Sequence, residues 1–152
     1  MIEPCPAVVT LAPSSVHPHP LTLTPTIVLK DGRPVMAVSV AGGDGQDQAT
    51  LQVLLNMIDF GMDVQAAIEA PRINSLHPES SFEDHLARLG VLEIERSAGD
   101  AVRAELQRRG HEVLVREPYG ISTGVVAAGI DPATGKRRGG ADPRRERYIV
   151  AW

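Results

Sequence analysis

Two adjacent glycines, Gly42 and Gly43, stand between an apolar run and an amphipathic segment, and this junction most constrains the fold. The apolar run, 35–40, has the composition of a strand. From Asp47 onward apolar residues recur every three or four positions, which predicts a helix from about Asp47 to Phe60, with Gly61 ending it. Glycines at such a strand-to-helix corner either allow tight packing or let a substrate oxygen reach backbone N–H groups.

A hairpin is predicted just before the corner. Residues 24–30 are rich in β-branched side chains and end at Asp31-Gly32, a strong signal for a tight turn, after which the run 35–40 resumes as a strand. Because this second strand is almost continuously apolar, we expect it to be buried on both faces.

The remaining elements follow from the same rules. Asp63 is expected to cap a short helix over 64–69, and 73–84 is predicted to be a loop. The pattern then predicts a small β-α-β unit, made of a strand at 90–95, a helix at 100–109 and a strand at 112–116. Two further strands, 124–130 and 137–141, are joined by a turn.

Composition excludes several classes of function. A net charge of −4 argues against nucleic-acid binding, and the basic run that includes Arg137, Arg138, Arg144 and Arg145 is interpreted as a solvated turn and strand end. No stretch is long and apolar enough for a membrane helix. The single cysteine cannot form an internal disulfide, and without a recognisable signal peptide the compartment stays open, with the cytoplasm favoured.

The sequence predicts two parts, a short N-terminal arm and a domain. Residues 1–20 are Pro-rich and are expected to form an extended arm, and residues 21–152 a single α+β domain. His17 and His19 in the arm lack a third ligand, so neither a metal nor another cofactor is expected. Asp44 or Asp47 is expected to be the N-cap of the helix after the glycines.

Four features in a fixed order resemble one family. They are Thr24-Pro25-Thr26-Ile27-Val28 with Lys30-Asp31-Gly32, Ala41-Gly42-Gly43-Asp44, Ile58-Asp59-Phe60-Gly61-Met62 with Ala70-Pro71-Arg72, and Gly139-Gly140-Ala141-Asp142-Pro143-Arg144. Together they resemble the C-terminal part of the small subunit of γ-glutamyltranspeptidases, also called glutathione hydrolases, which are N-terminal nucleophile hydrolases. The resemblance covers residues 20–152.

The resemblance implies a four-layer αββα sandwich, mainly antiparallel, and an N-terminal threonine that attacks a γ-glutamyl amide. It also implies that the N–H groups of Gly42 and Gly43 stabilise the oxyanion, and that Thr22 contacts the substrate. The family's threonine segment and the first of its paired serines have no counterpart here, since Leu21 stands at the serine position. No nucleophile is therefore expected in this chain.

Three hypotheses follow for function. The chain is either the C-terminal portion of a γ-glutamyltransferase-like hydrolase, inactive alone and completed by a polypeptide carrying the nucleophile, or a non-catalytic binding module, or an assembly component. The substrate expected for the first is a γ-glutamyl compound or another small amide. Because missing strands would leave sheet edges and one sheet face uncovered, a homo-oligomer or a complementary polypeptide is expected.

Overall fold

The computed structural model describes residues 7–10, 25–82, 85–131 and 134–150. Its larger sheet has five antiparallel strands in the order β1-β2-β3-β7-β8. The strands are β1 (Ala7–Thr10), β2 (Thr26–Lys30), β3 (Arg33–Ala41), β7 (Gly124–Ile130) and β8 (Arg137–Ala141). β1 lies within the segment assigned above to the Pro-rich arm, and it pairs with β2.

The predicted hairpin of β2 and β3 is confirmed. Asp31 and Gly32, at its turn, have φ values of 51° and 73°. Two consecutive residues with positive φ give the turn a twist that matches that of the strands, and Asp-Gly is a favoured pair for such a turn.

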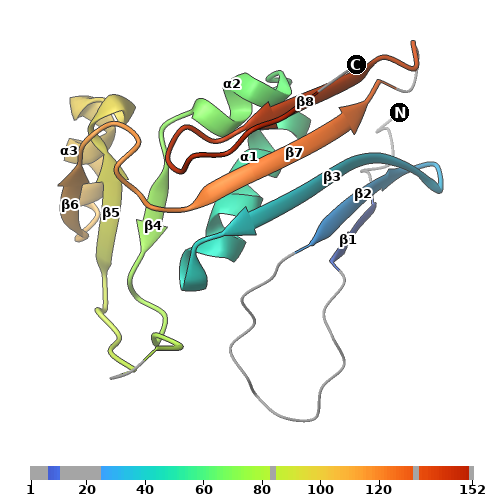
Figure 1. Cartoon of the computed structure of the whole chain (residues 1–152). Helices are drawn as coiled ribbons and strands as arrows, with labels where there is room; N and C mark the ends of the chain where they lie inside the picture. The colour runs from blue at the N-terminus through green and yellow to red at the C-terminus, as the bar shows by residue number, and fades with distance from the viewer. Residues whose placement is uncertain (1–6, 11–24, 83–84, 132–133, 151–152) are drawn as a thin grey trace.

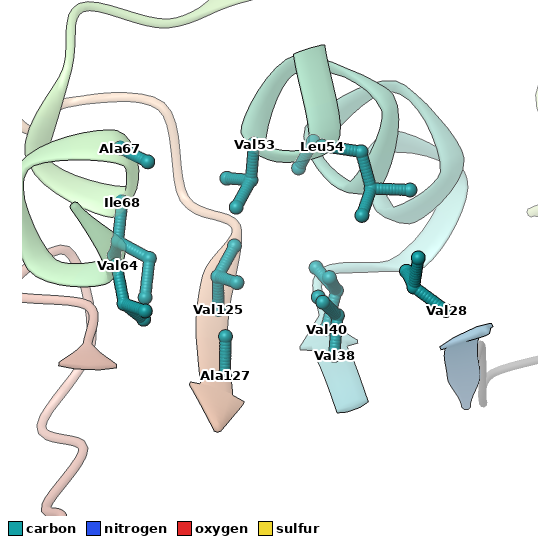
Figure 2. Packing of buried hydrophobic residues seen from close by; sticks show 11 residues of the cluster. Val28, Val38, Val40, Val53, Leu54, Val64, Ala67, Ile68, Val125 and Ala127 are labelled. Carbon is teal, nitrogen blue, oxygen red and sulfur yellow. The ribbon is translucent and has the colours of Figure 1, made fainter. Parts of the chain in front are cut away.

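Two helices cover one face of this sheet (Figure 1). They are α1 (Gln46–Ile58) and α2 (Val64–Glu69), and Asp63 caps α2 as predicted, because its Oδ1 accepts bonds from the amides of Gln65 and Ala66. Gly61, with φ 64°, follows α1 in the left-handed conformation. Between helices and sheet lies an aliphatic core of Val28, Val38, Val40, Ala49, Val53, Leu54, Val64, Ala67, Ile68, Val125 and Ala127 (Figure 2).

The opposite face of the sheet is open among the described residues. Val38 and Val40 of β3 are buried beneath the helices, but Ala37 and Ser39, which alternate with them, are exposed. The prediction that β3 is buried on both faces is therefore wrong for the described part of the chain, since an apolar run does not by itself supply a second covering layer. A groove of about 480 Å³ follows this open face, and the side chains of Tyr148 and Ile149 border it.

A second, three-stranded sheet stands beside α1. It contains β4 (Ile73–Ser75), β5 (Val91–Glu95) and β6 (Glu112–Arg116), with β4 antiparallel and β6 parallel to β5. Helix α3 (Asp100–Arg108) connects β5 to β6, so the predicted β-α-β unit is confirmed. The fold is thus α+β, with one antiparallel and one mixed sheet.

Strand β4 corrects the prediction of a loop over 73–84. Its free edge is paired by glutamine side chains of α1 instead of another strand. The Gln52 amide accepts from Ile73 N at 2.9 Å and donates to Ile73 O at 2.9 Å, and Gln48 does the same with Ser75 at 2.7 and 3.0 Å. Gln65 of α2 pairs in the same way with Ala141, at one end of β8.

Candidate functional site

The glycine corner joins β3 to α1 through a short 3₁₀ turn, Gly43–Gly45. Gly42 has φ 152° and Gly43 has φ 58°, conformations that side chains disfavour. The Gly42 carbonyl accepts from Gly45 N at 3.3 Å, and the Gly43 carbonyl accepts from Gln46 N. The carbonyls therefore point into the turn, and the amides of Gly42 and Gly43 come at its start, where helical N–H groups have no partner within the helix.

Each glycine of the corner also permits a close contact. A Cβ on Gly42 would lie 2.7 Å from Cγ2 of Thr123, and one on Gly45 would lie 2.8 Å from the same methyl. A Cβ on Gly43 would lie 2.9 Å from a ring carbon of Phe82. Tight packing thus gives a positive reason for these glycines, independent of any role in binding.

Thr123 connects the corner to a buried arginine. Nη1 of Arg72 donates to the Thr123 carbonyl and to its hydroxyl, both at 2.9 Å, and Nη2 donates to the Ile68 carbonyl at 3.0 Å. Thr123 lies within the chain, so it has no free α-amine, and its hydroxyl is already bonded to Arg72. It is therefore not an N-terminal nucleophile.

Arg72 belongs to an ionic cluster of four buried side chains, Arg72, Asp142, Arg144 and Glu95, each at most 2 % exposed. Arg72 pairs with Asp142 at 2.8 Å, and Arg144 pairs with Asp142 at 3.2 Å and with Glu95 at 2.6 Å. The two positive and two negative charges balance, as buried charges require. The ring of Tyr119 lies 5.2 Å from the Arg144 guanidinium.

The pKa values of the two arginines of this cluster shift in opposite directions. Burial has the largest influence on the pKa of Arg72 and lowers it; Asp142 opposes this, but the net shift is downward. Burial also lowers the pKa of Arg144, but its bonds to Glu95 and the charge of Asp142 outweigh burial, so this pKa is raised. Arg144 is the more strongly compensated cation.

Arg144 also corrects the interpretation of the basic run as solvated. Arg137, Arg138 and Arg145 are exposed, as expected, whereas the side chain of Arg144 is buried. Asp142 and Arg144 stand in the Asp-Pro-Arg sequence, and Arg72 ends the Ala-Pro-Arg sequence. These motifs carried the resemblance, but without a structure nothing indicated that their charged residues meet.

Asp44, which follows the glycines, is hydrogen-bonded to the loop that contains Ser80 and Ser81. This corrects its assignment as an N-cap. The N-cap positions are Gly42 for the 3₁₀ turn and Gly45 for α1, and no side chain caps either one. Oδ2 of Asp44 instead accepts from Ser81 N at 2.8 Å and from Ser80 Oγ at 3.2 Å. Burial raises the pKa of Asp44, but these hydrogen bonds outweigh it and the net shift is downward.

Of the other candidate residues, Thr22, His17, His19 and the cysteine lie outside the described residues. Gly42 and Gly43 are together at the corner. In the described ranges, no group of three or more His, Cys, Asp or Glu side chains is arranged to hold a metal ion. Nor does that part of the chain contain a helix with the length and apolar character needed to cross a bilayer.

A family model described as gamma-glutamyltranspeptidase matches residues 16–152. The chain belongs to this family. With the glutathione hydrolase-like YwrD proenzyme of Bacillus subtilis (strain 168) it is 34 % identical over 129 residues, which are 85 % of this chain and 23 % of that protein.

Solved structures agree with this assignment. Cephalosporin acylase from Bacillus halodurans matches with a TM-score of 0.72 and 30 % identity, over 85 % of this chain and 22 % of that one. The T380A mutant of Helicobacter pylori gamma-glutamyltranspeptidase matches with a TM-score of 0.68 and 27 % identity, over 86 % of this chain and 66 % of that one. The chain is thus a fragment of the family fold, within the N-terminal nucleophile hydrolases, and spans about a fifth of its curated relatives such as YwrD.

Proposed function

We propose that this chain supplies the oxyanion-binding part of an amide-cleaving site, and that a complementary polypeptide supplies the threonine nucleophile. In this proposal the chain corresponds to the C-terminal part of the small subunit of a γ-glutamyltransferase or glutathione hydrolase. The reaction is acyl transfer from, or hydrolysis of, a γ-glutamyl amide or another small amide.

The arrangement of the glycine corner is the observation that carries the proposal. The hydrogen bonds of the turn run from Gly45 N to the Gly42 carbonyl and from Gln46 N to the Gly43 carbonyl, so neither uses the amides of Gly42 and Gly43. Preorganised N–H donors of this kind stabilise a negatively charged oxygen, and loss of one such donor lowers a rate by about 100- to 1000-fold.

The open face of the larger sheet supports the involvement of a complementary polypeptide. The face carries Ala37, Ser39 and Ala128 in exposed positions, next to the partly buried Ile27 and Val126. Small and apolar side chains on a flat face suit close packing by a second sheet, as in an αββα sandwich. A second copy of the chain is the other candidate cover.

The test is hydrolysis of γ-glutamyl p-nitroanilide by the purified chain, alone and mixed with the polypeptide encoded beside it. We expect turnover only in the mixture, and a loss of about 100-fold or more in Gly43→Ala, because the added Cβ meets the Phe82 ring and displaces the amide. Gly61→Ala is the matched control, because Gly61 has a similar φ of 64° but no atom within 4 Å of an added Cβ. Turnover by the chain alone would contradict the proposal of a shared site.

The second candidate is a non-catalytic binding or assembly module. The contacts of Thr123 and Phe82 favour it, because they explain the glycines without chemistry. No turnover in the mixture, together with formation of a stable complex or oligomer in light scattering, is the result expected from this alternative.

A further inference from the structure

Phe82 lies directly against the glycine corner. Its ring carbons Cε2 and Cζ are 2.9 and 3.2 Å from the position of a Cβ on Gly43, so the ring edge sits beside the Gly43 backbone. An acceptor oxygen on the Gly43 amide would lie about 2.9 Å from that nitrogen. The group bonded to the accepting carbonyl would therefore come within reach of the ring.

Hydrogen bonds hold the backbone of Phe82 on both sides. Asp44, the residue after Gly43, binds Ser81 N and Ser80 Oγ, and Ser80 Oγ also accepts from Phe82 N at 3.1 Å. The Phe82 carbonyl accepts from His85 N at 3.1 Å. The loop is thus tied to the residue that follows the proposed oxyanion-binding amides.

Phe82 is 45 % exposed despite these contacts. It is one of two phenylalanines in a chain whose aromatic content is 3 %. Leu86 and Leu89, which follow it, are 63 % and 74 % exposed. Phe82 therefore presents apolar surface beside the corner that the described part of the chain does not cover, and Leu86 and Leu89 present more in the segment that follows.

We propose that Phe82 determines substrate specificity, favouring amides that carry an apolar group next to the scissile carbonyl. This inference rests on the proposed function, because it assumes that the carbonyl oxygen binds at Gly42 and Gly43. A half-exposed ring stabilises an apolar group by removing it from water and gives a carboxylate, such as that of a γ-glutamyl group, no comparable gain. The apolar group can stand on the acyl side or the leaving-group side of the carbonyl.

The experiment compares variants of the full chain, mixed with the polypeptide encoded beside it, by their kcat/KM for pairs of substrates. Hexanoyl and γ-glutamyl p-nitroanilide vary the acyl side, whereas γ-glutamyl p-nitroanilide and γ-glutamylglycine vary the leaving-group side. We expect Phe82→Ala to lower the preference for the apolar member of one pair by about 10-fold or more, and Phe82→Leu to restore part of it. The affected pair identifies the side of the carbonyl that the ring contacts.

Phe60→Ala is the matched control, because Phe60 is 74 % exposed just after α1 and is the other phenylalanine. Its preference ratios should equal those of the unmodified chain, and thermal unfolding of each variant checks folding. If turnover persists in Phe82→Ala with both ratios unchanged, this inference is overturned and the proposed function stands. If the mixture cleaves none of the amides, both are overturned.

Discussion

The ionic cluster and the glycine corner both include residues of the motifs that carried the resemblance, yet their environments are opposite. Arg72, Asp142, Arg144 and Glu95 are almost completely buried and satisfy one another's charges. The corner instead presents amides at the start of a helix and is flanked by the half-exposed Phe82. The charged residues therefore lie in the interior, whereas Gly42 and Gly43 are partly exposed, as the proposed function requires.

Thr123 is where these two regions meet. Its hydroxyl and carbonyl accept from Arg72, and its methyl fills the space left by Gly42 and Gly45. Thr123 therefore contacts both the buried cluster and the corner, and variants on either side of it test how tightly the two regions are coupled.

The largest effect is expected when the cluster loses one charge. Arg72→Leu leaves the Asp142 carboxylate buried with a single cationic partner, so we expect the free energy of unfolding to fall by about 3–5 kcal/mol. Urea denaturation followed by circular dichroism measures it. Arg96→Ala, which breaks the exposed pair with Glu117, is the control and should leave the midpoint unchanged. Equal midpoints for the two variants would show that the cluster does not hold the fold.

An intermediate effect is expected at the junction. Thr123→Val removes the hydroxyl that accepts from Arg72 but keeps methyl groups at Cβ, so we expect a loss of about 1–3 kcal/mol in the free energy of unfolding. Thr123→Ser keeps the hydroxyl and removes the methyl beside Gly42 and Gly45. Shifts of the Gly42 and Gly45 amide resonances in Thr123→Ser, without the stability loss of Thr123→Val, would separate the two contacts. Identical behaviour of the two variants would contradict this division.

The smallest effect is expected at Asp44. Because its pKa in the folded chain is lowered, its bonds to Ser81 and Ser80 add stability above the ordinary pKa of an aspartate, about 3.9, and that stability is lost as pH falls through the lowered pKa. An acid titration followed by the Ser81 amide resonance should show this local release. Asp44→Asn should abolish the response, and a response that survives in this variant must come from another group.

The sequence was sufficient to predict the elements that are determined by residues close together in the chain. The Asp31-Gly32 turn, the Asp63 cap and the helix α1 each depend on neighbours within a few positions, and the structure confirms them. The apolar spacing did not predict which face of α1 is buried, because Leu51 and Leu55 are 57 % and 40 % exposed whereas Ala49, Val53 and Leu54 are buried. The family also follows from short motifs that include Gly42 and Gly43.

The interactions that sequence reasoning missed join residues far apart in the chain. Strand β4 depends on Gln48 and Gln52, more than twenty positions away, and the polar composition of its surroundings indicated a loop. The buried Arg144 side chain pairs with Glu95, which lies 49 positions away, and nothing in the basic run predicts that partner. Asp44 binds Ser81 instead of capping a helix, because the fold brings a loop 37 positions away against it.

The paired glutamines have a consequence for how the chain meets other molecules. Gln48, Gln52 and Gln65 each occupy both the donor and the acceptor of one strand residue, at Ser75, Ile73 and Ala141. A peptide that adds as a strand to either sheet at these positions must first displace a glutamine side-chain amide. Recognition by strand addition is thus discouraged along β4 and at that end of β8.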